Sequence, residues 1–322
     1  MGQVTKIQWC DHTWNPWRGC IEVSEGCENC YAATMAKRNP RLLGVWGPAP
    51  MGRRVVASNE YFDLPWKWSR KAAESGTRHK VFCLSMGDIF EQWDGPIHDI
   101  GGVRTTLSMD DLRFRVLNLI ESTPDLDWLL LTKRPGEVLA TLRRIADRWP
   151  FQESLGRWLR RWLGGEPPAN VWLGVTVENQ VAAKERTLEL LEIPAVVRFV
   201  SYEPALEHME WPWFQMSMQV VKPGSLPIEY LPVPQVSWVI VGGESGPHAR
   251  PFNLAWARST IWQCRDAGVA CFVKQLGARP FDSFYRAEMI DQRIYLKHKA
   301  GADPSEWPED LRVQEFPTTV GA

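Results

Sequence analysis

The chain has 322 residues, 44% of them hydrophobic, which is enough for one large α/β domain or two ordinary domains with a buried core. Its formal net charge is −1, from 37 basic and 38 acidic side chains. Overall charge therefore gives no argument for binding to nucleic acid or anionic membrane, and leaves only a local basic groove for either.

The N-terminal sequence MGQVTKIQWCDHTWNP lacks the basic flank and apolar stretch of a signal peptide. No run approaches the roughly 18 apolar residues that a membrane span needs. We therefore expect a soluble, cytoplasmic protein without a membrane partner.

The first predicted strand covers residues 5–9 (TKIQW), and a loop with three cysteines follows it. Residues 31–38 (YAATMAKR) then have a helical pattern. Residues 39–78 are rich in Pro, Gly, Trp and basic side chains, and residues 211–236 resemble an inserted loop or lid. Connections of this length are often functional.

From residue 80 onward, short apolar runs alternate with amphipathic helical sequence. The runs cover residues 80–88, 127–135, 171–179, 196–204, 238–246 and 270–277. Nearly continuous Val, Ile, Leu and Phe is typical of parallel strands covered on both faces. Helices are predicted within residues 111–122, 136–149, 181–192 and 254–268, where apolar residues recur every three or four positions.

These elements predict an α/β fold, a full or partial (β/α) barrel of about six to seven parallel strands with Trp/Pro-rich insertions. A doubly wound open sheet is the alternative. We expect the barrel domain to cover residues 1–280, with insertions at 39–78 and 211–236. Residues 281–322 form a C-terminal extension, which we expect to be loosely structured.

Polar side chains follow each apolar run. They are Asp88, Lys133 with Arg134, Glu178, Glu203, Glu244, and Lys274 with Gln275. If the strands are parallel, these side chains surround the carboxyl end of the sheet, where α/β enzymes place their active sites. For any single glutamate, a helix cap or a loop salt bridge is the better interpretation, whereas the whole set favours a functional site.

The seven cysteines divide into four near the N-terminus and three scattered ones in apolar surroundings. The first four are Cys10, Cys20, Cys27 and Cys30, and the other three, Cys83, Cys264 and Cys271, are expected to be buried. In a cytosolic chain a close cluster indicates a metal before disulfides.

Cys20, Cys27 and Cys30 can wrap three thiolates around one metal centre. A structural zinc site would need a fourth ligand, and Cys10 or His12 could supply it. A three-thiolate [4Fe–4S] cluster would instead leave one iron open. The position of the loop between the first strand and the first helix favours the cluster.

Several sequence blocks carry a family resemblance. They are TWNPWRGCIEVSEGCENCYA, CLSMGDIF, LLLTKRP, WLGVTVENQ, FVSYEPAL, WVIVGGESGPHARP and FVKQLG, between about residues 7 and 277. The chain resembles the radical S-adenosylmethionine superfamily, and within it an atypical, mostly phage- and prophage-encoded family with a three-cysteine motif. Six residues separate Cys20 and Cys27, the first two cysteines of the motif, whereas the common superfamily spacing is three residues.

The resemblance implies a radical enzyme of the isomerase, mutase or lyase type. Cys20, Cys27 and Cys30 would hold a [4Fe–4S] cluster, and S-adenosylmethionine would bind its open iron and yield a 5′-deoxyadenosyl radical. The implied cofactor-binding residues are Ser85, Met86, Asp88, Lys133, Glu178, Glu203, Gly242, Gly243 and Glu244. Glu178, Glu203 and Lys274 are the implied catalytic residues, and flavodoxin or ferredoxin would donate the electron.

The family context implies a substrate in DNA or a modified nucleotide. The most specific expectation is isomerisation of a glycyl adduct on the 5-methyl carbon of thymine, in phage DNA hypermodification. Radical repair of a pyrimidine lesion is an alternative, and a non-catalytic, zinc-stabilised nucleic-acid-binding protein is another. Four basic, Trp-rich stretches are candidate DNA contacts or, at even odds, ordinary packed surface: PWRGC, MGRR, WKWSRKAAESGTRHK and RWLRRWLGG.

Overall fold

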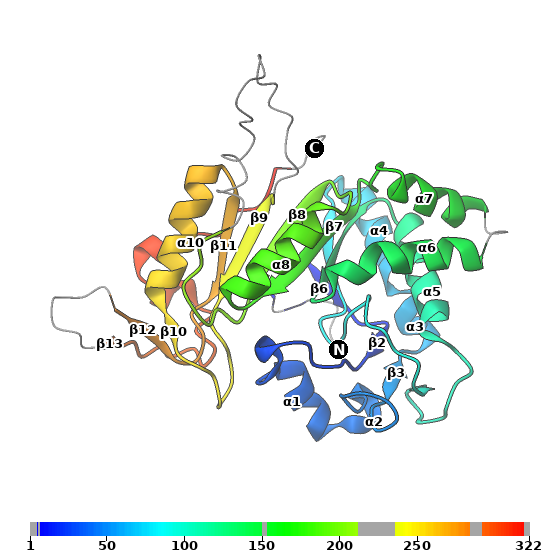
Figure 1. The fold of residues 1–322 in the computed structure, drawn as a ribbon, viewed down its shortest axis with the longest axis horizontal. Coiled ribbons are helices and arrows are strands. Elements are labelled where there is room, and N and C mark those ends of the chain that lie inside the picture. The colour runs from blue at the N-terminus through cyan, green and yellow to red at the C-terminus, as the bar shows by residue number, and fades with distance from the viewer. Residues whose placement is uncertain (1–4, 6, 150–152, 212–235, 284–291, 319–322) are drawn as a thin grey trace, which may run out of the picture. The chain divides into compact units, whose positions relative to one another are not determined.

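A seven-stranded parallel sheet is the main feature of the computed structural model, which describes residues 5, 7–149, 153–211, 236–283 and 292–318 (Figure 1). Its strands are β1 (His12–Trp14), β4 (His79–Cys83), β6 (Leu126–Thr132), β7 (Val171–Val177), β8 (Val197–Tyr202), β9 (Trp238–Gly242) and β11 (Ala270–Gln275). All except β1 overlap the apolar runs predicted as strands. Every residue of β7 and β9 is buried, as expected for strands covered on both faces.

The strand order confirms the α/β class and a partial (β/α) barrel. The order is β1-β4-β6-β7-β8-β9-β11, so the order of the strands across the sheet is the same as their order along the chain. A doubly wound sheet would reverse this order at one point. Within the residues described, β1 and β11 are the outer strands, so the sheet does not close into a full barrel.

The first strand does not lie where the sequence predicted it. Gln8 and Trp9 form a turn, in which the Cys10 N–H donates to the Ile7 carbonyl at 3.4 Å. Pairing with β4 begins only at Asp11, whose N–H donates to the Lys80 carbonyl at 2.9 Å. The strand predicted at residues 5–9 is therefore wrong in position, although Trp9 is buried.

The chain divides into two compact units. Unit 1 comprises Met1–Gly174 and Ile193–Val196, and unit 2 comprises Val175–Glu192 and Val197–Ala322. The predicted boundary at residue 280 lies within unit 2 and stays a prediction. The predicted insertion at 211–236 lies outside the described residues, apart from its two end positions.

Unit 1 carries most of the helices. They are α1 (Tyr31–Arg38), α2 (Pro40–Leu43), α3 (Asn59–Phe62), α4 (Leu64–Ser75), α5 (Met109–Glu121), α6 (Val138–Arg148) and α7 (Glu153–Leu163). The expected helices at 111–122 and 136–149 are α5 and α6, and these pack against each other and against α7 (Figure 1). The insertion at 39–78 is folded: it contains α2 to α4 and one strand of a small sheet, β2 (Trp17–Arg18), β3 (Arg54–Val56) and β5 (Ile97–His98).

Unit 2 contains α8 (Gln180–Leu191) and α10 (Leu254–Ala267), which match the helices predicted at 181–192 and 254–268. Its second sheet consists of β10 (Phe252–Asn253), β12 (Pro280–Asp282) and β13 (Gln292–Arg293). The described part of the C-terminal extension is anchored, contrary to expectation. The Val273 N–H donates to the Val313 carbonyl at 2.8 Å, and the Trp238 indole N–H donates to the Glu315 carbonyl at 2.9 Å.

Among the helices of the described segments, none is long and apolar enough to cross a membrane.

A capping box begins α5 and offers a test of this part of the fold. The Ser108 Oγ accepts from the Asp111 N–H, and the Asp111 carboxylate accepts from the Ser108 N–H at 2.7 Å. We expect Ser108→Ala to lower the free energy of unfolding by about 1 kcal/mol, because two N–H groups at the helix start lose their capping partner or its support. Urea unfolding measures this change.

Ser122→Ala is the matched control at the other end of α5, where backbone N–H groups form the cap. We expect it to change the free energy of unfolding by much less. Equal losses in the two variants would contradict a specific role of the capping box.

Candidate functional site

The three clustered cysteines lie on one segment of unit 1, between β2 and α1. Cys20 follows β2, Cys27 ends a short 3-10 helix (Glu25–Cys27), and Cys30 is the residue before α1. All three are half-buried, and none forms a disulfide. The segment is therefore accessible from its surroundings without being fully exposed.

Each of the three sulfur atoms faces an N–H donor. The Arg134 guanidinium Nη1 lies 3.9 Å from the Cys20 Sγ, and the Val23 N–H donates to the Cys27 Sγ at 3.5 Å. The backbone N–H groups of Ala32 and Ala33, in the first turn of α1, lie where they lower the pKa of Cys30. Donors of this kind stabilise thiolates, which are the form that binds metals.

Burial opposes ionisation of two of these thiols. It raises the pKa of Cys20, the nearby Glu91 and Asp88 carboxylates raise it further, and Arg134 opposes them. Burial also raises the pKa of Cys30, against the α1 N–H groups and the Lys133 ammonium. A metal at these sulfurs would displace protons from them.

The donor chemistry suits a thiolate-bound metal, although the side chains do not form a ready cage. Across the residues that the structure describes, no three His, Cys, Asp or Glu side chains lie close enough together to hold a metal ion. A bound centre would have to draw the three sulfurs closer together.

A buried ion pair positions Cys20. Arg54 and Glu91 have completely buried side chains and are joined by two hydrogen bonds of 2.7 Å. The Glu91 Oε1 also accepts from the Ile21 N–H at 2.5 Å, and the Arg54 guanidinium lies over the Trp93 ring at 3.7 Å. Gly19 adopts φ +114°, and a Cβ there would lie 2.7 Å from the Arg54 Cδ, so only glycine fits beside the pair.

The segment after β4 lies against the cysteine segment. The Ser85 carbonyl accepts from the Tyr31 hydroxyl at 2.9 Å, and the Gly19 N–H donates to the Met86 carbonyl at 3.0 Å. Asn15 holds this segment through the Ser85 Oγ (3.1 Å) and the Met86 N–H (2.8 Å). The Met86 side chain packs in an apolar cluster with which Cys30 is in contact. Ser85 and Met86 are thus brought beside the predicted cluster ligands.

Asp88 connects the ends of β4 and β6 to the same segment. Its carboxylate accepts from the Thr132 hydroxyl at 2.8 and 2.9 Å, from the Lys133 N–H at 3.1 Å and from Arg134 at 3.0 Å. The second guanidinium nitrogen of Arg134 donates to the Ile21 carbonyl at 2.9 Å. Arg134 therefore joins the strand ends to the cysteine segment, and Asp88 is saturated by partners within the protein.

In unit 2, Glu203 and Lys274 form an ion pair of 2.9 Å at the ends of β8 and β11. Gly242 lies beside them, since a Cβ there would be 2.6 Å from the Glu203 Oε1. A Cβ at Gly243 would lie 2.7 Å from the Leu276 carbonyl oxygen. Close packing of the chain thus accounts for both glycines without a ligand.

The other two predicted glutamates are also ion-paired. Glu178, whose side chain is completely buried, pairs with Arg186 of α8 at 2.9 Å. Glu244 pairs with Arg250 at 2.7 Å. These are loop and helix salt bridges of the kind expected for single glutamates, and the catalytic and cofactor-binding roles of Glu178, Glu203, Lys274 and Glu244 stay predictions.

The basic, Trp-rich stretches contain both buried and exposed side chains, and Lys67, Arg70, Lys71, Arg157, Arg160 and Arg161 are among the exposed ones. Arg18 is 7% exposed with its guanidinium 5.5 Å from the centre of the Tyr61 ring, and Arg54 is fully buried. Trp68 and Trp162 are 5% and 0% exposed. These four side chains therefore pack inside the protein, and contact of the exposed side chains of the stretches with DNA stays a prediction.

Fold and site together define a partial (β/α) barrel protein with ion-paired side chains at the strand ends and a half-buried cysteine segment. The chain belongs to the family described as "Protein of unknown function (DUF5131)", whose model matches residues 4–300. Searches of curated proteins and of solved structures found no match. The resemblance to radical S-adenosylmethionine enzymes is not addressed by this family description and stays a prediction.

The Arg54–Glu91 pair provides a test of how the cysteine segment is held. Arg54→Met would leave the Glu91 carboxylate buried without its cation, and we expect it to lower the free energy of unfolding by about 3–5 kcal/mol. In the double variant Arg54→Met/Glu91→Leu no charge is buried, so part of this loss should return. Urea unfolding followed by tryptophan fluorescence measures both. If the loss in the double variant equals the loss in Arg54→Met plus the loss in the single variant Glu91→Leu, the coupling is contradicted.

Proposed function

We propose that the chain is a radical S-adenosylmethionine enzyme in which Cys20, Cys27 and Cys30 hold a [4Fe–4S] cluster. The observation that supports this most is the set of N–H donors facing the three sulfurs, on a segment that charged groups hold against the ends of β4 and β6. When bound, cluster and cofactor supply a 5′-deoxyadenosyl radical that abstracts a hydrogen atom from substrate.

The surroundings of Cys10 and His12 favour three cysteine ligands over a closed zinc site. Cys10 is buried, and its Sγ points to the Ile7 carbonyl at 3.9 Å. The His12 ring stacks on Trp68 with 4.2 Å between ring centres, and its Nε2 lies 3.1 Å from the His79 Nδ1. Both candidates for a fourth zinc ligand are therefore engaged in β1 packing, which leaves the zinc-stabilised binding module less supported.

The protein's own residues would orient the cofactor and protect the cluster. Arg134 neutralises charge at Cys20 and fixes the segment through the Ile21 carbonyl. The Lys133 ammonium lies near Cys30 and is the proposed contact for the cofactor carboxylate. In unit 2, the partly exposed Lys274 is the proposed contact for an anionic ligand.

We propose a modified base in DNA as the substrate, most specifically a glycyl adduct on the 5-methyl carbon of thymine. The bond from that carbon to the glycyl nitrogen would break, and a bond to the glycyl α-carbon would form. The reaction is an isomerisation, because the abstracted hydrogen returns to the product. Reduced flavodoxin or ferredoxin would supply the electron that starts it.

Anaerobic purification with iron and sulfide analysis tests the cluster. We expect a brown parent protein that contains both elements and reductively cleaves S-adenosylmethionine, and a Cys27→Ala variant that has lost all three properties. Cys264→Ala is the matched control, because Cys264 is buried in α10 of unit 2, and we expect it to retain iron. A colourless parent that carries zinc after attempted cluster reconstitution would overturn the proposal.

Arg134 should affect iron retention without being a ligand. Arg134→Met removes the guanidinium from the Cys20 sulfur and from the Ile21 carbonyl, and we expect about 10- to 100-fold weaker retention of iron. Iron content after challenge with a chelator measures this, while Arg143→Met on the exposed side of α6 controls for charge and size. Unchanged retention in Arg134→Met would rule out this positioning role.

A further inference from the structure

The second sheet of unit 2 brings two arginines and an aromatic ring to one cavity. In its register, Asn253 lies opposite Phe281 of β12, and Phe281 lies opposite Arg293 of β13. Side chains alternate along a strand and directly opposite residues share a face. Phe281 and Arg293 therefore share a face, and Arg279, which directly precedes β12, lines the same cavity.

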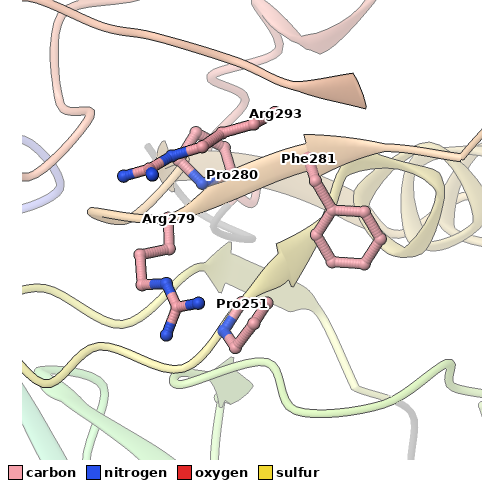
Figure 2. Close-up of a pocket in the computed structure, with 5 residues that line it drawn as sticks. All are labelled: Pro251, Arg279, Pro280, Phe281 and Arg293. Carbon is pink, nitrogen blue, oxygen red and sulfur yellow. The ribbon is translucent and has the colours of Figure 1, made fainter. Parts of the chain in front are cut away.

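A cavity of about 290 Å³ opens on this face, lined by Pro251, Arg279, Pro280, Phe281 and Arg293 (Figure 2). Figure 2 shows the guanidinium groups of Arg293 and Arg279 at the left of the view, above and below β12, and the Phe281 ring at the right. The volume of the cavity is at the lower end for small-molecule pockets, so it suits one charged group and a neighbouring ring better than a large cofactor.

Both cationic groups are available to a ligand. Arg279 donates to the Ala249 carbonyl at 3.4 Å, and the Arg293 guanidinium lies 5.1 Å from the centre of the Tyr295 ring. Within the described part of the chain, no ion pair joins either arginine to a carboxylate. Arg250 and Arg258 of the same unit, by contrast, are paired with Glu244, Asp282 and Asp310.

Two guanidinium groups that line one cavity suit a phosphate in charge, and arginine binds phosphate through two parallel hydrogen bonds. Tyr295 adds a second feature, because its ring is 82% exposed beside Arg293. An exposed aromatic ring next to phosphate-binding arginines is the arrangement with which proteins hold single-stranded nucleic acid, by stacking a base and pairing its backbone.

The cavity also adjoins the end of β9. Arg250, the partner of Glu244, directly precedes Pro251, and the Ala278 N–H donates to the Glu244 carbonyl at 2.8 Å just before Arg279. A strand held by its phosphate in the cavity would therefore have a neighbouring nucleotide close to the Glu244 segment.

We propose that Arg279, Arg293 and Tyr295 form a binding site for single-stranded nucleic acid, with a backbone phosphate between the arginines and a base on the tyrosine. The choice of nucleic acid as the source of the phosphate rests on the proposed function, whereas the phosphate site itself rests on the geometry of the cavity.

Fluorescence anisotropy with a labelled single-stranded DNA of about 12 nucleotides tests the site on the anaerobically prepared full chain. We expect Arg279→Ala, Arg293→Ala and Tyr295→Ala each to raise the Kd by about tenfold. The plot of log Kobs against log salt concentration has a negative slope, and each arginine variant should make it less steep by about 0.7. Tyr295→Ala should leave the slope unchanged. Arg265→Ala, an exposed arginine of α10, is the matched control and should bind like the parent.

Competition distinguishes the sources of phosphate. Unlabelled single strand should displace the probe at far lower concentration than a mononucleotide or inorganic phosphate. Equal competition by the mononucleotide would overturn the nucleic-acid assignment, and equal weakening by Arg265→Ala and the cavity variants would overturn the site.

Iron content of the same preparations separates this inference from the proposed function. Zinc in the parent together with weakened DNA binding in the cavity variants would refute the radical enzyme and support the site. If the parent is brown and cleaves the cofactor, but none of the three substitutions changes the Kd for DNA, the result would support the enzyme and refute the site.

Discussion

The buried pairing of Arg54 with Glu91 is the interaction on which the cysteine segment depends. Taking two charges out of water costs several kcal/mol for each ion, and hydrogen bonds must offset this cost. Here the Glu91 carboxylate accepts from Arg54 through both oxygens and from the Ile21 N–H. Since Ile21 directly follows Cys20, the hydrogen bond that satisfies the buried Glu91 carboxylate also fixes the position of Cys20.

The same rule of complete satisfaction extends to the strand ends. Asp88 accepts from a hydroxyl, a backbone N–H and the Arg134 guanidinium. Arg134 also donates to the Ile21 carbonyl and so connects Asp88 to the cysteine segment. In unit 2 the strand-end glutamates are likewise paired. An anionic ligand at Lys274 would have to displace Glu203, whereas the described residues show no ion pair at Lys133.

Much of the fold was predictable because buried parallel strands and amphipathic helices leave local patterns, as in β7 and α8. The first strand was not, because the hydrogen bond from the Asp11 N–H to the Lys80 carbonyl, which marks its start, joins residues far apart in the sequence. In the site, the cysteines and the strand-end charges were visible locally. Arg54 and Glu91 were not, since their partnership spans 37 positions and Arg54 looked like surface. A charged residue within the apolar run IFEQW was the one local signal for Glu91.

Electron paramagnetic resonance of the reduced protein, recorded anaerobically with and without S-adenosylmethionine, tests the central claim most directly. The account predicts an iron–sulfur signal whose shape changes when the cofactor is added, because three cysteines leave one iron for the cofactor to bind. A reduced protein that gives no iron–sulfur signal and contains zinc would contradict it.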